Sequence, residues 1–184
     1  MSPRFITIFL VIGLFGGCKQ PSAQQPQTAP SEIAALRAEA EKGDANAQYN
    51  LGVWYGRNVG VPEDEVEAVK WYHKAAEQGH AQAQYDLGIM YENGYGVLKD
   101  EAETAKWYRK AAEQGHPLAI FDIACIYAEG KGVPKDEVEA ATWYLKSANQ
   151  GCGDAWRELT DIYANGRGVS KDEVSLQVVP SYQP

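Results

Sequence analysis

The sequence predicts an all-α fold, a right-handed solenoid of stacked helix-turn-helix repeats. Chemically similar residues recur every 36 positions along most of the chain. Within each 36-residue unit, apolar residues follow the spacing of one helix face in two separate stretches. Glycine or asparagine follows these stretches, as is typical where helices end. Because one helix pair of this size cannot bury its own apolar face, neighbouring units are expected to stack.

The composition sets limits on the functions that are possible. The chain has 184 residues, of which 45 % are hydrophobic, so it can build a packed core and extensive disorder is excluded. Asp and Glu outnumber Lys and Arg by 25 to 17, which gives a net charge of −8. This balance argues against binding nucleic acid and against electrostatic docking on anionic lipid, because both need a basic surface.

The first 17 residues have the pattern of an export signal. Arg4 precedes a mostly apolar stretch at 5–17, which is shorter than the roughly 20 residues of a membrane-spanning helix. Residues 14–18 resemble the end of a bacterial lipoprotein signal, although such signals prefer leucine where Phe15 stands. The resemblance implies lipidation of Cys18 and an outer-membrane lipoprotein facing the periplasm. The alternative is an ordinary cleaved signal followed by a chance cysteine.

Residues 18–30 are expected to form a tether between the lipid and the folded part. The stretch 19–30 contains three Pro and four Gln and lacks any apolar periodicity. At about 3.1 Å per residue, such a semi-extended segment reaches roughly 35–40 Å. At the other end, the sequence predicts no defined structure for the C-terminal tail at 175–184.

The repeats begin with a half repeat at 31–44 and continue with full repeats at 45–80, 81–116 and 117–152, then a partial repeat at 153–174. Residues at equivalent positions of the full repeats are expected to form the core: Leu51, Gly52, Tyr55, Trp71, Leu87, Gly88, Tyr91, Trp107, Ile123, Tyr127 and Trp143. In the last repeat Pro180 falls where the second helix belongs. Because proline cannot continue a helix interior, this repeat is interpreted as a polar cap.

Each repeat is expected to contain a first helix, called helix A, and a second, called helix B. In the first full repeat helix A covers about 45–56, and helix B begins near Asp64. Asp64 and Glu67 have the spacing of a capping box, in which each side chain bonds the other residue's backbone N–H. Gly52 lies inside helix A at a cost of about 1 kcal/mol against alanine. The expected reason is a close approach of helix B.

The repeat unit resembles the Sel-one-like repeat, a relative of the tetratricopeptide repeat. The pattern A-x-x-x-L-G-x-x-Y-x-x-G-x-G-V-x-x-D is followed by W-Y-x-K-A-A-x-Q-G, and residues 83–88 and 107–115 are near-ideal copies. The resemblance covers about 31–174. It implies an α-solenoid that binds protein or peptide partners and has no catalytic activity.

The sequence contains few residues in patterns typical of catalysis or metal binding. His80 and His116 occupy the same position in successive repeats, which fits either a metal pair or a recurring turn residue. No motif for a metal or an organic cofactor is present, and none is expected to bind. Some members of the family have been described as binding or hydrolysing β-lactams, but no serine here is followed by lysine three positions later. The alternative function, an envelope hydrolase acting on β-lactams or peptidoglycan, therefore has no motif to support it.

Cys125 and Cys152 are not expected to form a disulfide. They lie nine positions apart in the repeat frame, which corresponds to about 13 Å along stacked helices. A disulfide needs Cα atoms within roughly 7 Å. Cys125 is expected to serve as a small apolar residue.

A partner is expected to bind the concave face, which helix A lines in the related tetratricopeptide repeats. The candidate residues are Tyr49, Asn50, Val53, Tyr85, Asp86, Ile89, Phe121 and Asp122. Three aromatic residues beside Asp86, Asp122 and Glu158 suit an extended segment that carries Lys or Arg. The alternative is that the aromatic residues only pack between helices. The expected function is thus a non-catalytic, membrane-tethered scaffold in the bacterial cell envelope.

Overall fold

The computed structural model describes residues 30–56 and 64–166. The predicted export signal, Cys18, nearly all of the predicted tether, Pro180 and the C-terminal tail lie outside the described residues. Within these two ranges every regular element is a helix. Among the described residues, none of these helices combines the length and the apolar character needed to cross a membrane.

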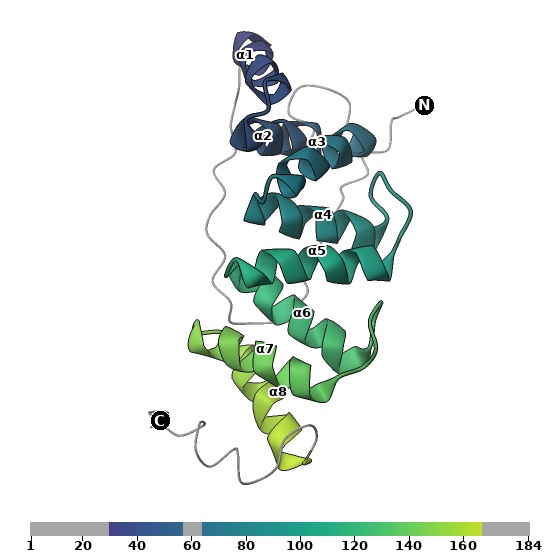
Figure 1. The fold of residues 1–184 in the computed structure, drawn as a ribbon, viewed down its shortest axis with the longest axis vertical. Helices are drawn as coiled ribbons and strands as arrows, with labels where there is room; N and C mark the ends of the chain where they lie inside the picture. The colour runs from purple at the N-terminus through teal and green to yellow at the C-terminus, as the bar shows by residue number, and fades with distance from the viewer. Residues whose placement is uncertain (1–29, 57–63, 167–184) are drawn as a thin grey trace, which may run out of the picture.

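Eight helices follow one another along the described part of the chain, and Figure 1 shows them stacked in order from α1 at one end to α8 at the other. They are α1 (Pro30–Glu41), α2 (Ala45–Gly56), α3 (Glu65–Glu77), α4 (Ala81–Asn93), α5 (Glu101–Glu113), α6 (Pro117–Glu129), α7 (Glu137–Asn149) and α8 (Gly153–Ala164). The pairs α2–α3, α4–α5 and α6–α7 are helices A and B of the full repeats, and each pair also packs on its neighbours. The predicted all-α solenoid is confirmed.

The core follows the repeat, with some exceptions at its rim. Leu51, Leu87 and Ile123 are fully buried, and Trp107 is 2 % exposed. Trp143, at the equivalent position of the next repeat, is only partly buried. The edge of the His73 ring covers Trp107, with 5.4 Å between ring centroids. In the next repeat Arg109 occupies the position equivalent to His73. Its guanidinium lies over the Tyr127 ring, 5.2 Å from the ring centre.

Tyr55 and Tyr91 are also partly buried, and both pack against the core. Both lie in the last turn of a helix A, at the rim of the helix pair. Their backbone carbonyls accept the N–H of the residue that caps the following helix B, Asp64 and Asp100. These tyrosines therefore mark the turn between the two helices.

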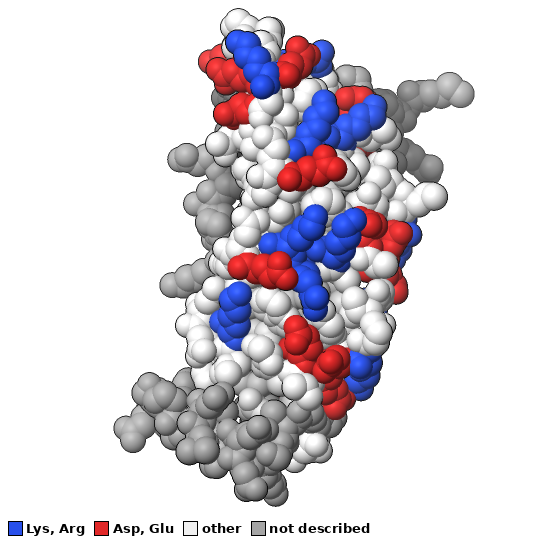
Figure 2. All heavy atoms as spheres, viewed as in Figure 1, with Lys and Arg blue, Asp and Glu red and all other residues white. Residues whose placement is uncertain are grey.

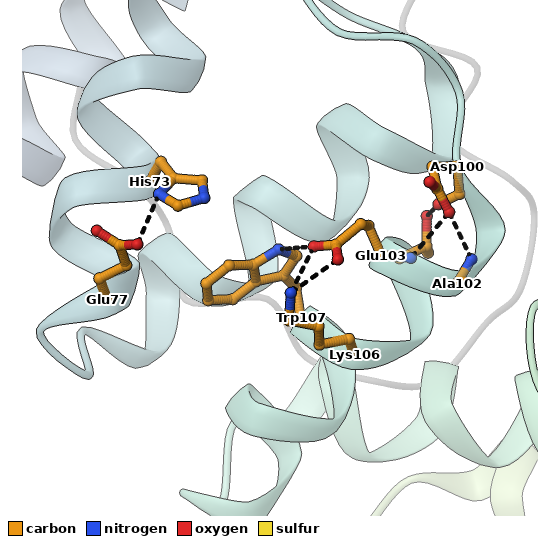
Figure 3. A network of polar contacts seen from close by, with 8 residues as sticks. His73, Glu77, Asp100, Ala102, Glu103, Lys106 and Trp107 are labelled. Atoms are coloured by element: carbon orange, nitrogen blue, oxygen red, sulfur yellow. Dashed lines mark hydrogen bonds and ion pairs between the residues drawn. The ribbon is translucent and has the colours of Figure 1, made fainter.

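The predicted capping box is half correct. Oδ1 of Asp100 accepts hydrogen bonds from the N–H groups of Ala102 and Glu103, at 2.9 and 3.0 Å. Glu103 does not return the bond, because the N–H of Asp100 donates to the Tyr91 carbonyl. Its carboxylate instead accepts the indole N–H of Trp107 at 2.9 Å (Figure 3). The glutamate of this cap therefore satisfies the polar atom of a core tryptophan.

The same bond recurs in α7, where Glu139 accepts the indole N–H of Trp143 at 2.9 Å. The first full repeat departs from it. There Glu67 pairs with Lys70, and Nε1 of Trp71 is buried without a hydrogen-bond partner.

The glycine inside helix A allows the close approach that the sequence predicts. A Cβ atom placed on Gly52 would lie 2.7 Å from Cδ1 of Tyr72 in α3. A Cβ on Gly88 would overlap the same atoms of Tyr108 in α5. In these two repeats the tyrosine of helix B therefore lies directly on the backbone of helix A.

The glycine-rich loops between helices A and B connect successive repeats. Gly94 ends α4 with φ +78°, the left-handed conformation expected there. Two residues later, a Cβ on Gly96 would collide with the backbone carbonyl of Glu65 at the start of α3. The N–H of Gly96 donates to Oε2 of Glu65 at 3.1 Å. The loop is thus a contact with the preceding repeat, and its glycines meet a backbone constraint.

We expect Gly88→Ala to lower the free energy of unfolding by about 1–3 kcal/mol, because the added methyl group overlaps the Tyr108 ring. Helix propensity alone favours alanine by about 1 kcal/mol, so the sign of the change tests the packing. Urea unfolding followed by circular dichroism measures it. The control is Ala124→Gly at the equivalent position of the next repeat, where alanine is native. A more stable Gly88→Ala protein would contradict the close approach.

Candidate functional site

The eight candidate residues lie on α2, α4 and α6, the first helices of the three full repeats. We call this set the helix-A surface: Tyr49, Asn50, Val53, Tyr85, Asp86, Ile89, Phe121 and Asp122. Its aromatic residues each contact the tyrosine of helix B in the same repeat. The ring centroids are 5.8 Å apart for Tyr49 and Tyr72, 5.2 Å for Tyr85 and Tyr108, and 5.7 Å for Phe121 and Tyr144.

Tyr85 lies at the joint between two repeats. Its ring stacks on Tyr108 and, on α6's side, on His116, with 4.5 Å between the Tyr85 and His116 centroids. Its hydroxyl donates a hydrogen bond to Oδ2 of Asp122 at 2.9 Å. Burial and the nearby Asp122 charge raise the pKa of Tyr85. The alternative that this aromatic position packs between helices is therefore correct for Tyr85, whose side chain is held by three neighbours.

The other members of the surface differ in their access to solvent. Asn50 is exposed, and Asp86 and Ile89 are partly exposed. Val53 is 9 % exposed and belongs to the core formed with α3 and α4, so its assignment to a partner-binding face is corrected. The reason is that α3 and α4 pack together over this side of α2.

The carboxylates on and around this surface make it locally acidic. Burial raises the pKa of Asp122 to about 6, while the hydrogen bond from Tyr85 acts in the opposite direction. The nearby Glu92 carboxylate also raises that pKa, and Glu92 accepts the hydroxyl of Tyr108 at 2.8 Å. At neutral pH Asp122 is ionised, so the joint carries negative charge against tyrosine hydroxyl groups.

The two recurring histidines are helix caps. Nδ1 of His80 accepts the N–H of Ala83 at 3.1 Å, and Nδ1 of His116 accepts the N–H of Ala119 at 3.3 Å. An Nδ1 that accepts a hydrogen bond carries no proton, so both rings are neutral in the folded state. Burial lowers the pKa of both histidines. The recurrence therefore reflects capping at a turn. Among the described residues, no group of three or more His, Cys, Asp or Glu is arranged to hold a metal ion.

A network of buried glutamines was not found from the sequence. Nε2 of Gln84 donates to the carbonyl of Ala76 at 3.0 Å, across the joint between repeats. Oε1 of Gln84 in turn accepts Nε2 of Gln114, which caps the end of α5, at 2.6 Å. The repeat before it has the same two bonds, from Gln48 and Gln78. The carbonyls of Ala40 and Ala76 each also accept a backbone N–H at the end of their helix, so the glutamine adds a second hydrogen bond across the joint.

The signal that could have revealed this network was the 36-residue recurrence of Gln at two polar positions. In the third full repeat Ile120 stands in place of the helix-A glutamine. There Nζ of Lys146 donates to the carbonyl of Ala112 at 3.0 Å and replaces the missing amide. At each of the three joints a side chain of a neighbouring helix therefore donates to this carbonyl, which also accepts a backbone N–H.

Cys125 is a free thiol, so it does not bridge to Cys152. It is partly buried, and the hydroxyl of Tyr144 donates to its Sγ at 3.3 Å. Burial raises the pKa of Cys125 to about 12. Because the thiolate is the reactive form, this cysteine is poorly suited to act as a nucleophile.

We expect the double variant His80→Asn, His116→Asn to lose less stability in mild acid than the wild-type protein. Both histidines have a folded-state pKa below the ordinary 6.5, so the unfolded chain binds protons first as the pH falls. Their contribution to stability is therefore lost progressively below about pH 6.5. Asparagine caps helices well and does not titrate in this range.

The measurement is urea unfolding between pH 5 and pH 7.5, with His73→Asn as a control that removes a surface histidine of α3. Asp122 acts with the opposite sign, because its raised pKa favours the folded state as the pH falls. It is common to all the proteins compared, so it cancels in the difference. Parallel pH profiles of the double variant and wild type would contradict the role of the caps.

Comparison with known proteins gives a consistent result. The Sel1 repeat family model matches residues 45–80, 81–116, 117–152 and 161–175, which together are more than half of the chain. No curated protein shows a significant sequence match to the chain.

One similar solved structure is a Sel1 repeat protein from Oxalobacter formigenes, with 37 % identity and a TM-score of 0.74. Another is c5321, a protective antigen present in uropathogenic Escherichia coli strains, with 43 % identity and a TM-score of 0.71. The matches cover 79 % and 78 % of this chain, but only 60 % and 31 % of those two proteins. The cysteine rich protein B of Helicobacter pylori, at 23 % identity and a TM-score of 0.56, shares the fold over 72 % of this chain and 98 % of its own length. The chain belongs to the Sel1 repeat family.

Proposed function

We propose that the protein is a non-catalytic scaffold, tethered to a membrane of the bacterial cell envelope, whose helix-A surface binds a partner segment carrying Lys or Arg. Sel1 repeat proteins generally act as scaffolds for protein–protein interaction and are typically non-catalytic. The observation that carries the basic preference is a series of carboxylates on successive first helices. Asp86 lies on α4, Asp122 on α6 and Glu158 on α8.

The environment of these carboxylates supports an electrostatic role. Glu158 is exposed, and Asp86 and Asp122 are partly exposed beside aromatic rings. Glu92 adds a further exposed carboxylate at the end of α4. Carboxylates that remain ionised beside partly buried aromatic rings offer a basic side chain both charge and contact area. Because Tyr85 and its neighbours are held in place by packing, little side-chain entropy is lost when a partner binds.

The tether and the lipid are the second half of the proposal. Cys18 directly follows the predicted export signal, and the predicted tether after it would reach roughly 35–40 Å when semi-extended. Anchoring of this kind would hold the solenoid near the membrane surface, while its repeats remain free to engage a partner.

We expect a photo-crosslinking amino acid at Asn50 to capture a discrete protein adduct in cells of the native host. Asn50 is exposed on the helix-A surface, so the replacement disturbs little packing. The control is the same amino acid at Glu77, which is exposed on α3. Mass spectrometry identifies the captured protein and the crosslinked peptide.

A crosslinked peptide rich in Lys or Arg, captured at Asn50 and absent at Glu77, supports the proposal. Equal capture at both positions, or a crosslinked segment without basic residues, contradicts it.

We expect Cys18→Ser to abolish incorporation of labelled palmitate and to release the protein from the membrane fraction. A serine side chain has no thiol for lipid attachment, while the rest of the export signal is unchanged. Cys125→Ser serves as the control, because Cys125 lies inside the solenoid and should not affect fractionation. Membrane association of Cys18→Ser equal to that of the wild type would rule out the lipid anchor.

A further inference from the structure

The second helices of the repeats carry a surface that the proposed function does not use. Although the net charge of the chain is −8, Lys and Arg gather over α3 and α5 in the view of Figure 2. In α5 they are Lys106, Arg109 and Lys110, which follow one another around a single turn of the helix. Two of them, Lys106 and Arg109, are exposed.

These three cations surround an open pocket at the joint between the second and third full repeats. Its volume is about 330 Å³, which is enough for one large side chain. The walls are apolar and come from α5, from α6 and from the loop that follows α6: Ala102, Ala105, Tyr127 and Val133. The pocket therefore combines an apolar floor with a positively charged rim.

Comparison with the equivalent positions of the neighbouring repeats indicates which of the three cations have a structural role. Lys74 and Lys146 are equivalent to Lys110, and each of these three lysines lies over the tryptophan of its own helix. Stacking on the core thus accounts for Lys110. Arg109 lies over a different ring, that of Tyr127 in the pocket wall, 5.2 Å from its centre. The equivalent residues are His73 and Leu145, so the fold does not require a cation at this position.

The position of Lys106 carries lysine in the preceding repeat but not in the following one. It is equivalent to Lys70 in the preceding repeat and to Thr142 in the following one. The backbone of this helix surface therefore tolerates threonine and leucine at the two positions that carry Lys106 and Arg109.

Two cations of the rim form exposed ion pairs with carboxylates of the same protein. Nζ of Lys106 lies 2.7 Å from Oε1 of Glu103, and a guanidinium nitrogen of Arg109 lies 3.6 Å from Oε1 of Glu139. Lys110 makes no ion pair within the described residues and lies 4.2 Å from the centre of the Trp107 ring. Exposed ion pairs contribute little net free energy, so an incoming carboxylate can exchange with them.

We propose that this pocket, named here the α5 pocket, binds an acidic peptide segment of a partner protein, with an apolar side chain in the pocket and flanking carboxylates on Lys106, Arg109 and Lys110. A local basic surface on an acidic protein is complementary in charge to such a segment, and the apolar volume between the cations accepts its apolar side chain. The site is distinct from the helix-A surface and has the opposite charge preference. A protein with both sites can bring together a basic and an acidic partner segment.

The experiment measures fluorescence anisotropy of the labelled peptide Glu-Glu-Phe-Glu-Glu with purified protein. We expect saturable binding that weakens as salt is added, because the contacts are solvent-exposed charges. Peptides in which Gln replaces every Glu, or Ser replaces Phe, separate the contribution of the charges from that of the pocket. Both are expected to bind more weakly than the parent peptide.

The test variant is Lys106→Thr with Arg109→Leu, which introduces the residues found at the equivalent positions of the following repeat. We expect roughly a tenfold loss of affinity, from the removal of two charge contacts. The matched control, Lys42→Thr with Lys70→Thr, removes two positive charges that do not line the pocket and should retain full affinity. Circular dichroism and thermal unfolding of each variant establish that the fold is intact.

Three results would overturn the proposal: no saturation at roughly millimolar protein, equal binding of the Gln peptide, or equal losses in the test and control variants. A fourth concerns lipid. Vesicles of phosphatidylglycerol and phosphatidylcholine are examined in parallel by flotation, and binding to vesicles without binding to the peptide would also overturn it, in favour of a membrane-facing surface.

Discussion

The joint between one repeat and the next is the contact on which the rest of the structure depends. A single helix pair leaves an apolar face and several backbone carbonyls uncovered, and only the next pair covers them. At the joint between α4 and α6, the Tyr85 ring stacks on the histidine that caps α6, and the Tyr85 hydroxyl bonds Asp122. Gln84 makes the equivalent connection to α3 through the Ala76 carbonyl. Apolar burial drives the stacking, and these polar bonds fix its register.

Stability and recognition share residues in this fold. The aromatic rings of the helix-A surface pack against helix-B tyrosines and only partly face solvent. They cannot be rearranged around a partner without loosening the joint, so recognition falls to the polar groups beside them, such as Asn50 and Glu158. The α5 pocket differs, because its cations lie outside the packed joint and their replacement leaves the core intact.

Positions where one repeat departs from the others indicate which contacts the fold requires. Where Ile120 replaces a glutamine, Lys146 donates to the Ala112 carbonyl in its place. Where Cys152 stands at the position of the histidine caps, α8 begins without a side-chain cap. Lys146 therefore compensates for the loss of the glutamine. The missing cap lies near the end of the described solenoid, where no further full repeat packs on α8 within the described residues. Arg109 lies over the Tyr127 ring, but Leu145 stands at the equivalent position of the next repeat, so the fold does not require a cation there.

The sequence by itself determined the fold class, the length of the repeat, the helix bounds and the glycines that admit helix-B tyrosines, because these follow from local spacing and from steric limits of the backbone. It also determined the family. Only the tertiary structure decided that Val53 is buried, that Tyr85 is committed to a joint and that Glu103 bonds Trp107 rather than completing its cap. It also decided that the buried glutamines bridge repeats and that three α5 cations surround an apolar pocket. Each of these depends on which side chains of different helices meet, and the period of one helix does not specify the packing of two.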